Sequence, residues 1–443
     1  MTKCNSEIIG FPALKTKNFF RKVELNFSGG EVTSDGGVLL LSRIDSNLGL
    51  TRNLAPYIKD PRNPSMISHS NEIMLKQRVY SLGLAYEDLN DQATLRQDTA
   101  LQTAVGRDSS LASPSTLCRF ENRGDRSTAI GFHKEFFNQF ISSFKQPPTE
   151  LIFDFDSTDD RVHGNQEGRH YHGYYEDYCF LPLYVFCGDQ LLVSYLRPSN
   201  IDGAKHAWAI AALLVKAVKK KWSDVQIIFR GDSGFCRHKM LRWFEKQNVK
   251  YIVGLPSNSI VKKNAASLVL EVENNYNLTL EKQKKYGEFF YAAQTWGEIL
   301  RRVIVKAEHN ALGENTRFIM TNLEGTPQDL YEKIYCARGE MENRIKEVQL
   351  CLFSDRTSCH DWWPNQFRML LSSVAYILLE TLRRVYLSTT DLAQAQVDTL
   401  KLKLLKIGAV IIRNTRRIKF YLSSYYPNKK IFIALAKSLF NTT

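Results

Sequence analysis

Residues 151–160 constrain the fold more than any other stretch, because this short apolar run ends in several carboxylates. Phe153 and Phe155 alternate with Asp154 and Asp156, so a β-strand here would carry aromatic rings on one face and two acids on the other. Burying the acidic face is costly unless the acids bind a metal ion or a proton. The first hypothesis is therefore a functional site at the end of a strand, with partner carboxylates elsewhere in the chain.

The length and composition are those of a multidomain globular protein. The chain has 443 residues, which at about 150 residues per domain fits two to four domains. No apolar run approaches the roughly 20 residues of a membrane-spanning helix, and the N-terminal residues lack the apolar segment of a signal peptide. The eight cysteines are scattered and form no CxxC pair of a zinc site. These features predict a cytoplasmic protein with reduced thiols and no membrane contact.

The positive charge of the chain is concentrated at its C-terminal end. Residues 399–443 contain ten basic residues and no acidic one, so they carry +10 of the net +13. A charge run is often only a solvated face, but tyrosines and apolar residues interleave this one, which predicts two strands about Asn414 and a final helix near residues 430–440. A basic folded surface fits contact with a phosphate backbone. Arg413, Arg416 and Arg417 are its candidate DNA-binding residues.

Proline residues and changes in the sequence pattern divide the chain into five regions. Residues 1–147 are predicted to form a mainly helical DNA-binding domain, in which the helix opened by Pro114 could lie on DNA or could simply connect its neighbours. Pro147 and Pro148 then break the chain. The remaining expected regions are a catalytic core in two parts with an inserted β-rich segment, and a basic C-terminal region that contacts DNA or dimerises. Their boundaries are 148–255, 256–316, 317–388 and 389–443.

A second acid follows a later strand of the same expected sheet. Two strands, 178–186 and 191–196, a helix, 204–219, and a strand from Val225 that ends at Asp232 follow the first strand. A helical crossover lets this last strand lie parallel to the first, which brings Asp232 near the end of the first strand. Residues 274–279 are expected to form a loop within the inserted segment.

Two features could supply further ligands. The Gly-, His- and Tyr-rich segment 162–175 contains His170 and His172, which could face one metal ion, although such loops more often close over a substrate. A long helix is predicted from Leu330 to about residue 352, with Glu342 among polar residues spaced by three and four. A solvated face with Glu-to-Lys pairs is the alternative for that helix. Because the helix follows the last core strand directly, it can instead present Glu342 to the crevice of the two acids.

The three carboxylates together suggest a reaction class. Asp156, Asp232 and Glu342 offer hard oxygen ligands suited to Mg²⁺, with Mn²⁺ as a substitute. Two such ions, about 3.5–4 Å apart, can clamp the attacking and leaving oxygens of an in-line phosphodiester displacement. The predicted chemistry is phosphoryl transfer on nucleic acid.

At these positions the sequence resembles the DDE transposases of bacterial insertion sequences, which have an RNase H-like catalytic core. It is similar to the group whose third carboxylate lies in a Tyr-x2-Arg-x3-Glu-x6-Lys signature. Tyr335, Arg338 and Glu342 match the first three members. Gln349 occupies the Lys position, and Lys346, one turn earlier on the same face, is the candidate substitute.

The resemblance also chooses between the acids of the opening segment. The first acid of this group is typically followed by Ser or Thr and then Thr, which selects Asp156, before Ser157 and Thr158, over Asp154. The segment from Arg230 to Phe235 resembles the surroundings of the second acid, Asp232. The similarity extends over residues 151–386 in the order typical of the family.

The resemblance implies an α/β fold. It consists of an RNase H-like mixed-sheet core with a β-rich insertion before the last core strand, flanked by a helical N-terminal domain and a basic C-terminal region. It also implies a nucleoid-associated homodimer that brings two transposon ends and target DNA together, with hairpin intermediates in some members. Tyr335, Arg338 and Lys346 would contact the DNA backbone. Trp296, within the insertion, could stack on a flipped base or could be an ordinary core residue.

The resulting hypothesis is a cut-and-paste transposase that binds the terminal inverted repeats of its insertion sequence and uses two divalent ions to cleave and transfer DNA strands. A catalytically silent DNA-binding derivative, and a nuclease without strand transfer, are the main alternatives. A glycosidase that uses Asp156 and Glu342 as an acid/base pair is a remote one.

Overall fold

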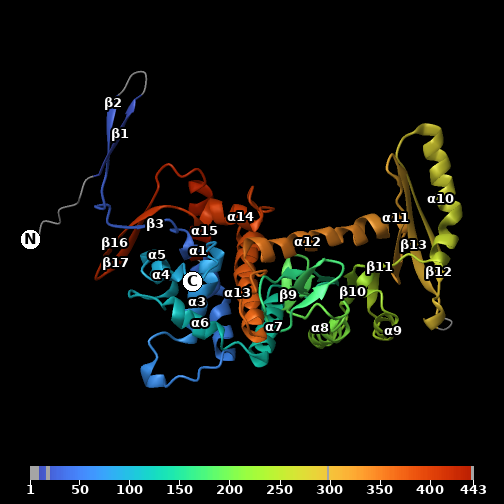
Figure 1. The fold of residues 1–443 in the computed structure, drawn as a ribbon, viewed down its shortest axis with the longest axis horizontal. Helices are drawn as coiled ribbons and strands as arrows, with labels where there is room; N and C mark the ends of the chain where they lie inside the picture. Colours follow the sequence, from blue (N-terminus) through green and yellow to red (C-terminus); the bar gives the residue numbers. More distant parts are fainter. Residues whose placement is uncertain (1–8, 16–19, 297–298, 441–443) are drawn as a thin grey trace, which may run out of the picture. The chain divides into compact units, whose positions relative to one another are not determined.

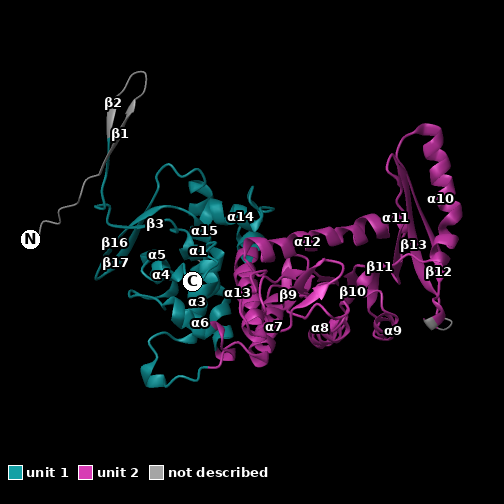
Figure 2. Ribbon diagram, in the orientation of Figure 1, with its two compact units in different colours: residues 1–55, 60–120, 381–443 teal, residues 56–59, 121–380 magenta. Residues whose placement is uncertain are grey.

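The computed structural model describes residues 9–15, 20–296 and 299–440. The chain forms two compact units, shown in Figure 2. Unit 1 comprises residues 1–55, 60–120 and 381–443, and unit 2 comprises residues 56–59 and 121–380. This division differs from the one expected from the sequence, because the C-terminal residues join the N-terminal ones in a single unit. The cause in the backbone is strand pairing, since β16 (Ala409–Asn414) pairs with β3 (Glu31–Thr33).

A nine-stranded mixed sheet forms the centre of unit 2 (Figure 1). Its order is β12-β13-β15-β11-β10-β4-β8-β9, with β14 paired to β13. The strands are β4 (Glu150–Ser157), β8 (Leu183–Cys187), β9 (Gln190–Tyr195), β10 (Gln226–Gly231), β11 (Lys250–Leu255), β12 (Gln283–Tyr291), β13 (Arg301–Asn310), β14 (Gly313–Glu314) and β15 (Arg317–Thr321).

The directions of the strands confirm the predicted crossover. β4 is antiparallel to β8 and parallel to β10, and β10 is parallel to β11. Helix α8 (Ala207–Lys221) lies between β9 and β10 in the chain. The prediction of a single strand over residues 178–186 is wrong, because two strands, β7 and β8, occupy this range. Pro182 lies between them and has no N–H to donate to a sheet. Strand β7 (Asp177–Phe180) instead forms a small sheet with β5 (Asp160–Arg161) and β6 (His170–His172).

The inserted segment extends the core sheet. Strands β12 and β13 lie within the predicted β-rich segment, and β15 joins them to the core by pairing with both β13 and β11. The loop expected at residues 274–279 is wrong, since these residues end helix α10 (Ser259–Thr279). Val261 and Ala265 of α10 are buried in the core cluster, and this packing outweighs the low helix propensity of the asparagines near its end.

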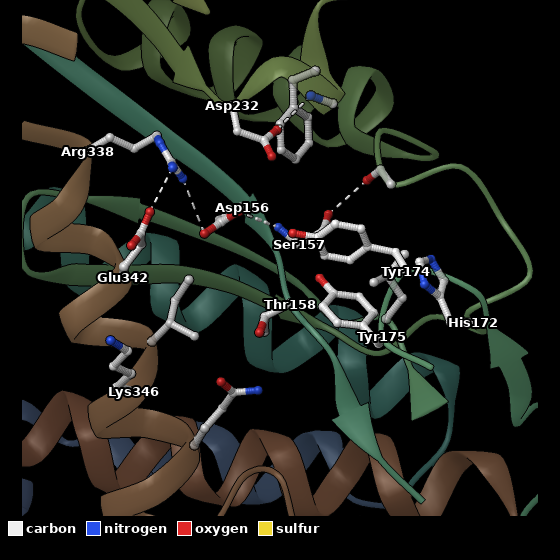
Figure 3. Close-up of a pocket in the computed structure, with 16 residues that line it drawn as sticks. Asp156, Ser157, Thr158, His172, Tyr174, Tyr175, Asp232, Arg338, Glu342 and Lys346 are labelled. Atoms are coloured by element: carbon white, nitrogen blue, oxygen red, sulfur yellow. Dashed lines mark hydrogen bonds and ion pairs between the residues drawn. The ribbon is translucent and has the colours of Figure 1, made fainter. Parts of the chain in front are cut away.

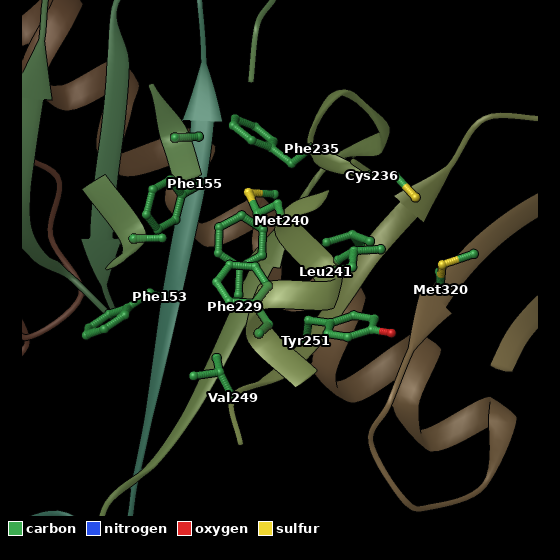
Figure 4. Close-up of a cluster of buried hydrophobic side chains, with 14 of the residues drawn as sticks. Phe153, Phe155, Phe229, Phe235, Cys236, Met240, Leu241, Val249, Tyr251 and Met320 are labelled. Carbon is green, nitrogen blue, oxygen red and sulfur yellow. The ribbon is translucent and has the colours of Figure 1, made fainter. Parts of the chain in front are cut away.

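The two faces of the sheet carry different cores. Phe153 and Phe155 are buried in a cluster with residues of α8 and α9 (His238–Lys246), and the ring of Phe155 lies 4.7 Å from that of Phe229 (Figure 4). Ile152, on the opposite face of β4, packs with the cluster that contains Leu330 and Tyr331. The predicted alternation on β4 is therefore confirmed, and its acidic face lies on the side of the long helix.

That helix is continuous but irregular. Residues 330–351 are helical throughout, with π-helical turns at both ends, a 3₁₀ turn at residues 336–338 and α12 (Gly339–Lys346) between them. Unit 2 also contains the helices α7 (Arg126–Ser142), α11 (Pro327–Asp329) and α13 (Trp362–Thr381). A one-turn 3₁₀ helix follows β10 at Ser233–Phe235.

Unit 1 combines helices with a small sheet of order β17-β16-β3. The predicted strand pair about Asn414 and the final helix are confirmed as β16, β17 (Arg417–Leu422) and α15 (Lys429–Phe440). Unit 1 also contains the strands β1 (Ile9–Lys15) and β2 (Phe20–Leu25) and the α-helices α1 (Val38–Leu48), α2 (Leu50–Leu54), α3 (Asn71–Gly83), α4 (Gln92–Leu95), α5 (Thr99–Val105), α6 (Pro114–Glu121) and α14 (Val397–Leu400). Among the described residues of the whole chain, no helix is long and apolar enough to cross a membrane.

Candidate active site

A pocket of about 560 Å³ opens in unit 2 where β4 and β10 end beside α12 (Figure 3). All three predicted carboxylates line it, although they come from segments up to 186 residues apart in sequence. The lining residues are Asp156, Ser157, Thr158, His172, Tyr174, Tyr175, Leu181, Gly203, Asp232, Gly234, Phe235, Arg338, Glu342, Ile345, Lys346 and Gln349.

The two acids of β4 have different surroundings. Asp156 lies near the strand end, lines the pocket and accepts a hydrogen bond from the Ser157 amide at 2.9 Å. Asp154 is 2% exposed and pairs with the buried Arg230 of the neighbouring parallel strand, with Nη2 donating to Oδ2 at 2.7 Å. Burial raises the pKa of Asp154, and the Arg230 guanidinium opposes that rise. Asp154 is thus a buried structural partner, and Asp156 is the acid available to a ligand.

Asp232 follows β10 directly, and its own side chain fixes the turn. Its Oδ1 accepts a hydrogen bond from the Gly234 amide at 2.9 Å, which caps the 3₁₀ turn. Behind this turn, a Cβ on Gly254 would lie 2.7 Å from the Ser233 amide nitrogen and 2.8 Å from the Tyr335 hydroxyl. Tyr335 therefore packs against the backbone beside Asp232 and does not line the pocket.

Glu342 and Arg338 reach the pocket from the irregular helix. Arg338 Nη2 lies 2.7 Å from Glu342 Oε1, and its Nη1 lies 3.5 Å from Asp156 Oδ2. The spacing of four residues places both side chains on one helical face, as predicted. A single guanidinium therefore bridges the first and third carboxylates.

The electrostatics of the pocket are dominated by its acids. Burial raises the pKa of the Asp156 carboxyl to about 7 against the opposing charge of Arg338, and the negative charges of Asp232 and Glu342 add to the rise. The three carboxylates thus interact across the pocket. This excess of negative charge is the kind that a bound cation compensates.

Comparison with known families decides the identity. A family model described as "Transposase DDE domain group 1" matches residues 15–443. The chain belongs to this transposase family. Membership confirms the predicted DDE transposase class and implies DNA transposition. Among solved structures, the transposase is similar to a piggyBac transposase in a cryo-EM synaptic complex with hairpin DNA, at 12% identity and a TM-score of 0.40, covering 84% of this chain and 80% of that chain. No curated protein sequence matches the chain.

The donor chemistry of the pocket fits hard divalent cations. Carboxylate oxygens of Asp156, Asp232 and Glu342 are the ligand type that Mg²⁺ and Mn²⁺ prefer. In the described part of the transposase, however, no three His, Cys, Asp or Glu side chains are grouped closely enough to hold a metal ion. The Arg338 guanidinium lies between two of the candidate donors, and the histidines of the 162–175 segment form no such group either. The donors are present, and their gathering around an ion requires side-chain movement.

Both candidates for the last signature position line the pocket, but their surroundings differ. Lys346 is exposed and lines the pocket. Gln349 is buried, and its Nε2 donates to the backbone carbonyl of Asp159 at 3.1 Å. Of the two candidates, only Lys346 is exposed, while the Gln349 amide is hydrogen-bonded to the backbone.

Aromatic residues missed in the sequence line one wall of the pocket. Tyr174 is 84% exposed and packs edge-on against Tyr175, with ring centroids 5.0 Å apart. Tyr175 in turn packs on His172, 4.9 Å away. These residues come from the Gly-, His- and Tyr-rich segment, whose composition was the available signal. That segment contributes to the pocket as a wall, which fits its interpretation as a substrate-facing loop.

Other predicted DNA-binding residues lie outside the pocket. The ring of Trp296 stacks on His238 at 5.7 Å, and Arg301 lies over it at 5.1 Å, so its described neighbours are residues of the same unit. Arg413, Arg416 and Arg417 lie exposed on the β16–β17 hairpin of unit 1. Arg413 Nε is 3.0 Å from Glu31 Oε1 on the neighbouring strand.

Proposed function

We propose that this transposase binds the terminal inverted repeats of its own insertion sequence and catalyses metal-dependent cleavage and transfer of DNA strands, in a cut-and-paste reaction. One observation carries the proposal. Asp156, Asp232 and Glu342, from three separate segments, line a single pocket in a chain of the DDE transposase family.

The core strand order supports an RNase H-like catalytic domain. The order β9-β8-β4-β10-β11 combines an antiparallel meander of three strands with two strands parallel to the first. The acids at the ends of the adjacent strands β4 and β10 are brought together by this order, since parallel neighbours end at the same edge of a sheet.

We assign the roles of the pocket residues as follows. Asp156, Asp232 and Glu342 would hold two Mg²⁺ ions, which when bound activate the attacking oxygen and stabilise the leaving oxygen. Lys346 and Arg338 would neutralise the charge of the scissile phosphate, because both cations face the pocket that holds the acids. The exposed ring of Tyr174 offers a surface for a sugar or nucleobase of the bound strand.

The DNA outside the pocket would be held by basic and helical surfaces. We assign Arg413, Arg416 and Arg417 to contacts with the phosphate backbone, which their exposure on a two-stranded hairpin permits. A homodimer would present two active sites to the two ends of a mobile element. Tyr335 is better suited to supporting the Asp232 turn than to contacting DNA, given its position behind that turn.

The proposal is tested with DNA that carries the element's own termini, taken from the sequences flanking the coding region. We expect purified protein and Mg²⁺ to nick the DNA at the terminal repeats and to join the freed 3′ ends into a target plasmid, with EDTA abolishing both steps. Binding without nicking would indicate a catalytically silent DNA-binding protein. Nicking without joining would indicate a nuclease.

A further inference from the structure

Arg197 carries a buried guanidinium next to the pocket. The proposed reaction does not use this group. Arg197 lies just after β9 and is 0% exposed. In the described part of the chain its hydrogen bonds go only to carbonyl and hydroxyl oxygens and none to a carboxylate. A buried charge without an ion-pair partner is costly, so its retention calls for a specific arrangement of acceptors.

The guanidinium of Arg197 donates hydrogen bonds to three separate segments of the chain. Nε donates to the Leu181 carbonyl at 2.9 Å, and Nη1 donates to the carbonyls of Gly203 at 2.9 Å and Lys205 at 2.6 Å. Nη2 donates to Ser157 Oγ at 2.7 Å. The backbone adds to this, since the Arg197 carbonyl accepts from the Leu181 amide at 2.8 Å. Only a planar group with several N–H donors can reach all these acceptors at once.

Three of the four acceptor residues line the pocket. Ser157, Leu181 and Gly203 belong to its walls, and they come from the end of β4, the β7–β8 connection and the loop before α8. Ser157 Oγ also donates to the Gly203 carbonyl at 2.8 Å, so the hydroxyl accepts from one neighbour and donates to the other.

Two hydrogen bonds connect Arg197 to the first catalytic carboxylate. Arg197 Nη2 holds Ser157 Oγ, and the Ser157 amide donates to Asp156 Oδ1 at 2.9 Å. Moving the Ser157 backbone would therefore turn the Asp156 carboxylate. A catalytic group displaced by about 1 Å can cost roughly 100-fold in rate.

We infer that Arg197 is a positioning residue of the active site, which fixes Ser157, and through it the Asp156 carboxylate, against two other walls of the pocket. The inference rests on the proposed function. It also gives a physical reason for a hydroxyl residue directly after Asp156, since this hydroxyl links the strand end to the guanidinium.

The test compares Arg197→Lys and Ser157→Ala with a matched control, Arg301→Lys. Arg301 is another buried arginine of unit 2, bound to Glu245 through Nε at 2.6 Å and Nη2 at 3.0 Å, and it does not line the pocket. Each variant is measured for its melting temperature, for direct Mn²⁺ binding by electron paramagnetic resonance, and for the single-turnover rate of DNA nicking.

Arg197→Lys is expected to slow nicking by about 100-fold and Ser157→Ala by about 10-fold, because both loosen the Asp156 carboxylate. Both should weaken Mn²⁺ binding, whereas Arg301→Lys should lower the melting temperature and leave Mn²⁺ binding unchanged. Ser157→Thr, which keeps the hydroxyl, should recover most of the loss seen in Ser157→Ala.

Two different results would distinguish failure of the inference about Arg197 from failure of the proposed function. If the wild-type protein binds Mn²⁺ and nicks DNA, but Arg197→Lys changes only the melting temperature, as Arg301→Lys does, then Arg197 is a structural residue and the inference is overturned. If the folded wild-type protein neither binds Mn²⁺ nor nicks its terminal DNA, the proposed function fails, and the inference fails with it.

Discussion

Arg338 lies one helical turn before Glu342, and its Nη2 contacts the Glu342 carboxylate at 2.7 Å. The same guanidinium reaches Asp156 at 3.5 Å. Both carboxylates are proposed metal ligands, so a side-chain cation is paired with two of the groups that would hold a divalent ion. Ion binding and the Arg338 ion pairs should therefore compete.

Replacing Arg338 by glutamine should separate ion binding from catalysis. Arg338→Gln is expected to bind Mn²⁺ roughly threefold to tenfold more tightly, the range given by the loss of partly exposed competing ion pairs. Its nicking rate should fall by about 10-fold to 100-fold, because the phosphate loses a neutralising charge. Mn²⁺ titration and single-turnover nicking measure the two effects. Lys333→Gln, which removes an exposed cation of the same helical segment outside the pocket, serves as control. Weaker Mn²⁺ binding by Arg338→Gln would contradict the competition.

Replacing each of the two acids of β4 by asparagine should affect different properties of the protein, stability for Asp154 and nicking activity for Asp156. Asp154→Asn leaves Arg230 buried without its charge partner, which is expected to lower the free energy of unfolding by about 3 kcal/mol. Asp156→Asn should abolish nicking and change that free energy by less than about 1 kcal/mol, because no buried partner is lost. Urea unfolding and the nicking assay distinguish them. An Asp154→Asn protein that is fully stable but inactive would reverse the assignment of the two acids.

The last position of the signature can be assigned by substituting both candidates. Lys346→Ala should weaken binding of terminal DNA and reduce the slope of log affinity against log salt by about 1, as expected for the loss of one phosphate contact. Gln349→Ala should instead cost about 1 kcal/mol of stability through the hydrogen bond to Asp159 and leave the salt slope unchanged. Binding isotherms at several salt concentrations give the result. An altered salt slope in Gln349→Ala alone would assign the role to Gln349.

The stability of unit 2 should fall in mild acid because of His133. Burial lowers the pKa of His133 to about 4, and its Nε2 lies 3.1 Å from the Ser194 carbonyl. The folded state keeps this imidazole neutral while the unfolded chain takes up a proton below about pH 6.5, so its contribution is full above pH 6.5 and is lost as the pH falls toward 4. Between pH 7.5 and 5.0 the loss should be about 2 kcal/mol.

Urea unfolding of the wild type and of His133→Gln at both pH values isolates this effect. The variant is expected to be less stable at pH 7.5, because contacts of the imidazole are lost, but to lose less stability on acidification. Equal losses in both proteins would show that His133 does not titrate with folding.

The sequence predicted that the three acids face one crevice, and they line one pocket. This was possible because strand alternation, strand order and helical spacing depend on local patterns. The sequence pattern alone could not show which acid of β4 is buried, because Asp154 and Asp156 lie on the same face of the strand. The neighbouring strand decides this in the structure, where Arg230 pairs in register with Asp154. Here the family resemblance selected Asp156, and the register supplies the physical reason.

Other features depended on contacts between distant segments. The asparagines at residues 274–277 indicated a loop, yet burial of Val261 and Ala265 against the sheet extends α10 through them. Trp296 was considered for base stacking because of its place in the insertion, but the ring of His238, from a distant part of the sequence, stacks on it, and the nearby Arg301 lies over it. The role of Arg197 was also invisible, because its acceptors come from three segments that only the fold brings together.

The central claim is that Glu342 completes a metal-dependent site with Asp156 and Asp232. The most direct test is Mg²⁺-dependent nicking of the element's terminal DNA by Glu342→Ala, with Glu340→Ala as control, since Glu340 is exposed on the same helix outside the pocket. We predict that Glu342→Ala binds the terminal DNA but does not nick it, while Glu340→Ala nicks at the wild-type rate. Normal Mg²⁺-dependent nicking by Glu342→Ala would contradict the assignment of the active site.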